Sequence, residues 1–210
     1  MADWSTIAAL ATGGGTLVLA VATFSSVRAS NRSARIAEQA LLLGQRPFLA
    51  PAGETDPQLT VAFGDRHVTT VGAGMAAVEL DNDHFYLVLP LRNVGAGIAV
   101  LHAWRVTPSH VVSADAPDLE SLRPQQRDLY IPAGGVGFWQ GALRERSDEM
   151  RAGLDEAFAA GERITLDLLY GDHEGGQRAI SRFSLIPTGD GAWLPGVTRH
   201  WRMDGVNPRG

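Results

Sequence analysis

Three patterns of hydrophobic and polar residues follow one another along this chain. Residues 4–27 contain no charged side chain. Residues 28–45 then place Ile36, Ala40 and Leu43 at a helical spacing, with charged residues between them. From Arg46 onward, apolar positions mostly alternate with polar ones, which indicates β-strands. The pattern therefore predicts a long N-terminal helix followed by a β-domain.

The uncharged run is long enough to cross a membrane as a helix. At about 1.5 Å per residue, a helix of this length reaches about 36 Å, and a hydrocarbon core is about 30 Å thick. A cleaved secretory signal would carry positive charge before a shorter apolar stretch. Here Asp3 precedes the run and Arg28, Arg32 and Arg35 follow it. We therefore predict a retained transmembrane anchor over residues 1–27.

The arginines also predict an orientation. Arg28, Arg32 and Arg35 flank the C-terminal side of the run, so the positive-inside rule places the N-terminus outside and the remaining chain in the cytoplasm. Residues 28–45 are expected to continue as a juxtamembrane helix that Gly44 and Pro47 terminate. All 18 basic residues are arginine, which together with abundant Ala, Gly and Pro is typical of a GC-rich bacterial genome. The predicted location is a bacterial inner membrane.

Small residues recur at four-residue spacing within the run. Such stripes allow helices to pack closely in lipid. The expected partners are therefore the lipid bilayer and a second copy of the helix or another membrane protein. The stripes are Ala8, Thr12, Thr16 and Ala20 on one face, and Ser5, Ala9 and Gly13 on another.

The β-region is expected to form one domain over residues 46–206, with a disordered tail at 207–210. The clearest alternating runs cover residues 85–92 and 164–170. Short strands separated by Gly, Pro, Asp and Asn are typical of an antiparallel sandwich. Further strands are predicted at residues 48–50, 59–63, 76–80, 98–106, 129–131, 136–140 and 179–186.

Two features interrupt or connect the predicted strands. Residues 170–177 indicate a hairpin turn. Residues 144–160 predict one crossover helix over one end of the sandwich, with Met150, Leu154 and Phe158 on its apolar face.

Two short motifs resemble a group of bacterial proteins. The helix ends in R-P-F-L-A-P, residues 46–51, and a predicted strand closes in L-R-N-V-G-A-G-I-A, residues 91–99. This arrangement resembles uncharacterised bacterial single-pass membrane proteins, and the second motif is similar to a strand-to-strand turn of bacterial immunoglobulin-like sandwiches. The resemblance implies an immunoglobulin-like β-sandwich behind a membrane anchor. It implies no catalytic residues.

Composition excludes several functional classes. The chain has no cysteine, so it has no disulfide, thiolate nucleophile or zinc–thiolate site. Residues 47–210 hold 14 arginines and 21 acidic residues, a net charge of −7. Such a domain is repelled by phosphate backbones, which argues against binding to nucleic acid. No P-loop, G-x-S-x-G or H-E-x-x-H motif is present.

The remaining polar clusters are explained by turns. Residues 81–84 and 172–174 are rich in oxygen donors that calcium accepts, but their spacing is not that of an EF-hand, and turns favour the same residues. Gly95 and Gly97 lack the third glycine of a dinucleotide loop. His102 is expected to be a hydrogen-bonded residue at the edge of the core. We predict no catalytic, cofactor-binding or metal-binding residue and no cofactor.

The C-terminal segment of residues 193–203 allows two interpretations. Trp201, flanked by Arg199 and Arg202, is a candidate interaction or membrane-interface site, because Trp and Arg are favoured at both. The alternative, which we favour, is a final strand that buries Trp193 and exposes His200.

The sequence thus predicts a membrane-tethered, non-catalytic interaction module with an unknown protein partner. Its binding surface is expected at an edge strand or at loops far from the membrane. Two alternatives stay open. One is an extracytoplasmic binding domain with reversed topology, and the other is a hydrolase or metal-dependent enzyme whose site assembles only in three dimensions.

Overall fold

The structure is a computed structural model that describes residues 3–109 and 111–203, without the side chains of residues 4–12, 18, 39, 42 and 43. The chain divides into two compact units, residues 1–44 and 45–210. The predicted tail at residues 207–210 lies outside the described residues.

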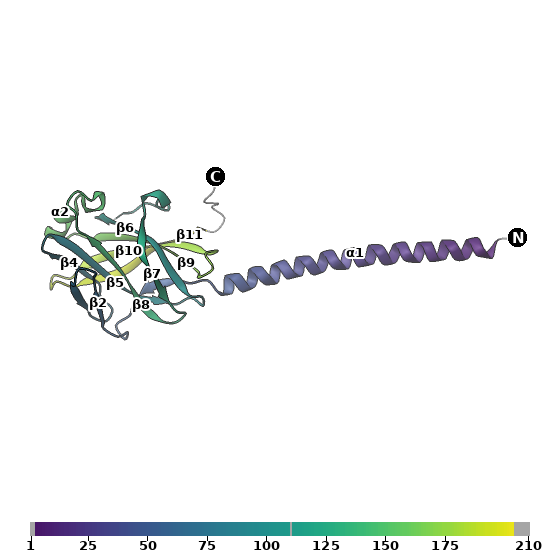
Figure 1. Cartoon of the computed structure of the whole chain (residues 1–210), viewed down its shortest axis with the longest axis horizontal. Helices are drawn as coiled ribbons and strands as arrows, with labels where there is room; N and C mark the ends of the chain where they lie inside the picture. Colours follow the sequence, from purple (N-terminus) through teal and green to yellow (C-terminus); the bar gives the residue numbers. More distant parts are fainter. Residues whose placement is uncertain (1–2, 110, 204–210) are drawn as a thin grey trace. The chain divides into compact units, whose positions relative to one another are not determined.

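The first unit is a single helix, α1 (Trp4–Gly44), of 41 residues (Figure 1). It runs unbroken through the arginines and ends at Gly44, where the sequence predicts the end of the helix. Among the described residues, no helix contains a stretch long and apolar enough to cross a membrane. The side chains of the first half of the predicted anchor, including Ser5, Ala8, Ala9 and Thr12, lie outside the described set.

The second unit is mainly β and contains two large antiparallel sheets and a separate hairpin. In the first sheet the central strand is β5 (His84–Asn93). Along one edge it pairs with β1 (Leu49–Pro51) at one end and with β4 (Ala77–Asp81) at the other. Along its other edge it pairs with β8 (Val136–Leu143).

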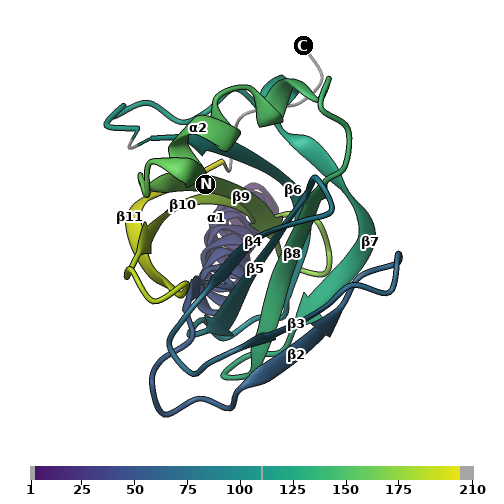
Figure 2. The ribbon, with the colours of Figure 1, turned by 90° about the vertical axis from the view of Figure 1, so that its left-hand side faces the viewer.

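The second sheet has the order β11–β10–β9–β6–β7. Figure 2 shows this sheet curving around to face the first one. The hairpin of β2 and β3 lies against the outer face of the first sheet, where Val61 and Phe63 pack on Tyr86 and Val88. The bounds of these strands are β2 (Leu59–Ala62), β3 (Val68–Val71), β6 (Ala99–Pro108), β7 (Arg123–Ile131), β9 (Ile164–Gly171), β10 (Arg178–Pro187) and β11 (Trp193–Arg202).

Alternating side chains of the two sheets form one core. On β9, Ile164, Leu166 and Leu168 point into it, as the two-residue period predicts, and all three are completely buried. Leu87 and Leu89 of β5 face them from the first sheet. The observed fold is therefore a sandwich-like pair of antiparallel sheets.

The predicted crossover helix of residues 144–160 is shorter than expected. The chain forms a 3₁₀ turn, η2 (Glu149–Arg151), and then α2 (Leu154–Ala159). Gly153 separates them with a φ of +77°, a left-handed conformation that interrupts an α-helix. The predicted apolar face is nevertheless used, since Leu154 and Phe158 close one end of the core against Phe85 and Trp193.

Two strands differ from the sequence prediction. β7 spans nine residues, whereas the sequence predicted only the last three. The first six were missed because most of them are polar, and all six are at least partly exposed to solvent. β3 was not predicted, because its four residues V-T-T-V form a strand only by pairing with β2. The strand interpretation of residues 193–203 is correct in that β11 buries Trp193, which is 3% exposed. His200 was expected to be exposed but is half-buried, because its Nδ1 lies 3.1 Å from Ser181 Oγ.

Candidate functional site

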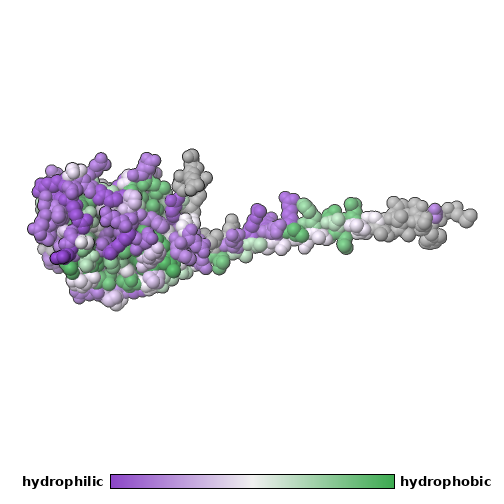
Figure 3. Space-filling model, viewed as in Figure 1, coloured by the Kyte–Doolittle hydropathy of each residue, from purple (hydrophilic) through white to green (hydrophobic). Residues whose placement is uncertain are grey.

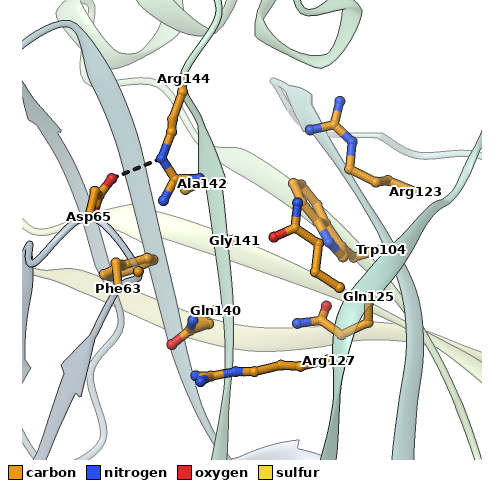
Figure 4. Close-up of a pocket in the computed structure, with 12 residues that line it drawn as sticks. Phe63, Asp65, Trp104, Arg123, Gln125, Arg127, Gln140, Gly141, Ala142 and Arg144 are labelled. Carbon is orange, nitrogen blue, oxygen red and sulfur yellow. Dashed lines mark hydrogen bonds and ion pairs between the residues drawn. The ribbon is translucent and has the colours of Figure 1, made fainter.

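A cleft of about 540 Å³ separates the outer edges of β7 and β8 (Figure 4). We call it the β7–β8 cleft. Its walls are Gln125 and Arg127 on β7 and Gln140 and Ala142 on β8. Trp104 of β6 lies between these walls, and its ring packs edge-on against Trp139 at a centroid distance of 5.2 Å. The turn of the β2–β3 hairpin borders one side. A volume of this size suits a small ligand or a few residues of peptide.

The cleft exists because two consecutive strands do not pair. Among the described residues, β7 forms its hydrogen-bonded ladder only with β6, and β8 only with β5. β7 also bulges: Pro124 pairs with Ala103 and Leu129 with Leu101, so residues 125–128 lie opposite His102 alone. An edge strand directs every second N–H and C=O group outward. The cleft is therefore flanked by backbone groups that can accept an additional strand.

Three arginines surround the cleft, and two of them are neutralised. Arg123 donates from Nη2 to both carboxylate oxygens of Asp148, at 2.6 and 2.7 Å. Arg144 donates from Nε to Asp65 at 2.8 Å. Arg127 has no hydrogen-bond or ion-pair partner within the described part of the chain, and its side chain extends from β7 toward Gln140. One uncompensated positive charge therefore lies across the cleft of an otherwise acidic domain.

Asp65, the carboxylate of the cleft, is tightly held. It accepts hydrogen bonds from the Tyr86 hydroxyl and from Arg144, both at 2.8 Å. Partial burial acts to raise the pKa of Asp65, but these two hydrogen bonds outweigh it and hold the pKa well below its usual range. An acid of such low pKa stays ionised at neutral pH, so Asp65 is a poor proton donor or general base.

Tyr86 links Asp65 to a second set of polar side chains under the hairpin. The His67 ring stacks on Tyr86 at 3.8 Å, and its Nε2 lies 2.9 Å from a carboxylate oxygen of Glu79. Burial raises the pKa of Tyr86, and the hydrogen bond to Asp65 adds to this effect. These contacts fix the β2–β3 hairpin, and with it Asp65, at the rim of the cleft.

Two glutamine amides of the cleft carry unused acceptors. The Oε1 atoms of Gln125 and Gln140 are buried and have no hydrogen-bond partner among the described residues. Buried polar atoms in native proteins are nearly always hydrogen-bonded. The two amides can therefore accept hydrogen bonds from a group that enters the cleft.

The residues singled out in the sequence lie elsewhere. Arg28, Arg32 and Arg35 are exposed on α1, where Figure 3 shows a polar stretch beside a hydrophobic one. Arg199 and Arg202 are exposed on β11, the edge strand of the second sheet opposite β7.

Trp201 has a structural role. Its Nε1 donates to the carbonyl of Ala114 at 2.9 Å, and the Arg182 guanidinium lies 4.9 Å from its ring centroid. It thereby holds the loop of residues 111–122 over the outer face of the second sheet.

Beneath this loop lies a buried ion cluster. Asp167 is completely buried and accepts from Arg182 Nε at 2.6 Å and from Arg105 Nη2 at 3.0 Å. Arg182 is itself only 2% exposed. Asp167 thus pairs with the buried Arg182 and with the partly exposed Arg105, and its oxygens are not available to a ligand.

A serine–histidine pair lies at the seam between β1 and β11. Ser181 Oγ is 3.1 Å from His200 Nδ1 and 3.0 Å from the Tyr170 hydroxyl, which accepts a hydrogen bond from Leu49 N. Ser181 is completely buried, so a substrate has no access to its hydroxyl. The group joins β1 to the second sheet.

The two acidic turns have different partners: Asp83 of the first is paired with arginine, whereas Asp172 of the second accepts from Gly176 N at 2.8 Å. Asp83 accepts from both Arg146 and Arg151. The first of these hydrogen bonds is the main reason that the pKa of Asp83 is lowered. Among the described residues, no group of three or more His, Asp or Glu side chains could hold a metal ion.

Sequence reasoning missed the cleft residues. Gln125, Arg127 and Gln140 follow no motif, and their proximity depends on two strands failing to pair. The only available signal was the polar character of residues 123–128, which is unusual before a predicted strand. No family model, no curated protein and no solved structure matches this chain.

Proposed function

We propose that the protein is a membrane-tethered, non-catalytic interaction module that binds its partner in the β7–β8 cleft. The observation that carries this proposal is the pair of unpaired strand edges facing each other across about 540 Å³. Peptides commonly bind proteins by adding a strand to such an edge. The low pKa of Asp65 favours binding over acid–base catalysis at this place.

We also propose that the β-domain is an immunoglobulin-like sandwich. It is supported by two antiparallel sheets that enclose one core and by a chain that crosses between them from β8 to β9 through α2. In such sandwiches, edge strands and end loops are the usual binding surfaces.

The support for membrane tethering comes from the N-terminal unit. The uncharged residues 4–27 are followed by three arginines. Leu17, Leu19 and Phe24 of α1 are 68%, 71% and 67% exposed, which is costly in water and favourable in lipid. The same arginines support an orientation with the β-domain in the cytoplasm.

A reporter fused to the C-terminus tests the orientation. We expect a cytoplasmic reporter to be active and a periplasmic reporter to be inactive, with the protein in the membrane fraction after alkaline extraction. Activity only on the periplasmic side would support the extracytoplasmic alternative.

Site-specific photo-crosslinking tests the cleft. A photoreactive amino acid at Gln126, an exposed residue of the cleft wall, should give a discrete adduct in cells. The matched control is the same amino acid at Arg163, which is exposed and outside the cleft. Equal labelling at both positions would remove the cleft from the proposal.

A further inference from the structure

The charges around the β7–β8 cleft define the charge of its ligand. Asp148 neutralises Arg123, and Asp65 neutralises Arg144. Arg127 alone remains without an ion partner among the described residues. The cleft therefore presents one uncompensated positive charge, which matches one carboxylate. A phosphate carries about two negative charges at neutral pH and would remain undercompensated.

The glutamines define which hydrogen-bonding groups the ligand carries. The buried Oε1 atoms of Gln125 and Gln140 are acceptors and need N–H or O–H donors. An inorganic anion has few or no donors and would leave both unpaired. A peptide carries a donor at almost every residue. Leaving such a buried group unsatisfied costs about 1–3 kcal/mol.

The strand edges define the shape of the ligand. β7 and β8 each present one unpaired edge to the cleft, and an extended segment can form a ladder with either. Its side chains would alternate between opposite directions, so that one side faces the Trp104 ring at the floor. Trp104 is buried, and the Arg123 guanidinium lies 5.2 Å from its ring centroid. The floor is therefore an almost fully buried indole with a guanidinium against its ring.

We propose that the β7–β8 cleft binds an extended acidic peptide segment, with one Asp or Glu carboxylate paired to Arg127 and backbone N–H groups donating to Gln125 and Gln140. This proposal rests on the proposed function of the cleft as a binding site. Arg127 is the residue that selects for the carboxylate. Because Arg127 is exposed and makes no hydrogen bond or ion pair with the described part of the chain, we expect its replacement to leave the fold intact.

The test is calorimetric titration of the full chain in lipid nanodiscs. The probe is the acetylated and amidated peptide Thr-Val-Glu-Val-Thr, and its matched control is Thr-Val-Gln-Val-Thr. Free glutarate and inorganic phosphate are the other two probes. The protein variants are Arg127→Gln and, as a matched control, Arg163→Gln, which removes an exposed arginine outside the cleft.

We expect the glutamate peptide to bind the wild-type chain at least about tenfold more tightly than the glutamine peptide, since charge-assisted hydrogen bonds are about twice as strong as neutral ones. R127Q should abolish this ratio, and R163Q should preserve it. Thermal unfolding of R127Q at the wild-type temperature would show that the loss is not one of folding.

Other outcomes overturn the inference in distinguishable ways. If both peptides bind equally, the carboxylate is not recognised, although the proposed binding function stands. If glutarate or phosphate binds and neither peptide does, the cleft is a site for small anions. If no probe binds but the crosslink at residue 126 persists, the ligand chemistry is wrong and the function stands. If the crosslink also fails, both proposals fall.

Discussion

Gly97 lies directly against the carbonyl oxygen of Gln45, so closely that a β-carbon at residue 97 would overlap this oxygen. Asn93 completes the contact: its Oδ1 accepts from Phe48 N, and its Nδ2 donates to Gly97 O. The two motifs that carry the sequence resemblance, residues 46–51 and 91–99, therefore contact each other. Together they hold the first segment of the β-domain in place.

We expect Gly97→Ala to destabilise the β-domain by about 1–3 kcal/mol, because the added methyl group forces the backbone at Gln45 to move. Chemical denaturation measures the effect. Gly196→Ala is the matched control, since a β-carbon at residue 196 meets no atom within 4 Å. Equal stability of the two variants would show that the contact with Gln45 is loose.

Replacement of Asp167 tests the buried ion cluster. Asp167→Asn should lower the free energy of unfolding by about 3–5 kcal/mol, because the buried Arg182 loses its counter-charge. The double variant D167L/R182M should lose less than D167N, since it removes the buried Asp167–Arg182 pair and leaves only the partly exposed Arg105 without its counter-charge. Asp128→Asn, at an exposed position, should change stability by less than about 0.5 kcal/mol. A D167N loss as small as that of D128N would contradict the buried cluster.

Trp201 is predicted to act through the loop of residues 111–122. Trp201→Ala removes the hydrogen bond to Ala114 and the contact with Arg182, and should cost about 1–3 kcal/mol. Limited proteolysis should then cut within this loop. Trp201→Phe keeps an aromatic ring and should lose only about 1 kcal/mol for the hydrogen bond. If W201A keeps full stability but loses partner binding, Trp201 belongs to an interaction site instead.

Asp65 should contribute to the acid sensitivity of the fold. Its pKa in the folded state lies below the ordinary value of about 4, so its stabilising effect is present above that value and is lost as the pH falls below it. Between about pH 5 and pH 3, the wild type should lose more stability than Asp65→Asn, which has no carboxylate to protonate. Urea denaturation at several pH values measures the difference. Parallel curves for the two proteins would show that the hydrogen bonds from Tyr86 and Arg144 do not lower this pKa.

Local patterns predicted the elements whose form depends on their own residues. The alternation of Ile164, Leu166 and Leu168 indicates a strand, because every second side chain of a strand points to the same face. The end of α1 at Gly44 follows from the weak helix propensity of glycine and the proline that comes after it. Trp193 was correctly predicted to be buried on a final strand.

Patterns failed where pairing between distant segments decided the outcome. β3 is a four-residue strand that is recognised only through its pairing with β2, since V-T-T-V is too short to show a clear alternation of polar and apolar residues. The helix predicted over residues 144–160 is interrupted, because Gly153 adopts a left-handed conformation.

The sequence by itself determined a β-domain behind a long helix, the acidic charge of that domain and most of its strands, since each of these depends on composition or on neighbouring residues. Only the tertiary structure decided that β7 and β8 remain unpaired and that Gln125, Arg127 and Gln140 face one cleft. The physical reason is that a cleft is made by the absence of a hydrogen-bonded ladder between two edges. No single segment carries that information, because whether two edges pair depends on how both strands are placed in the fold.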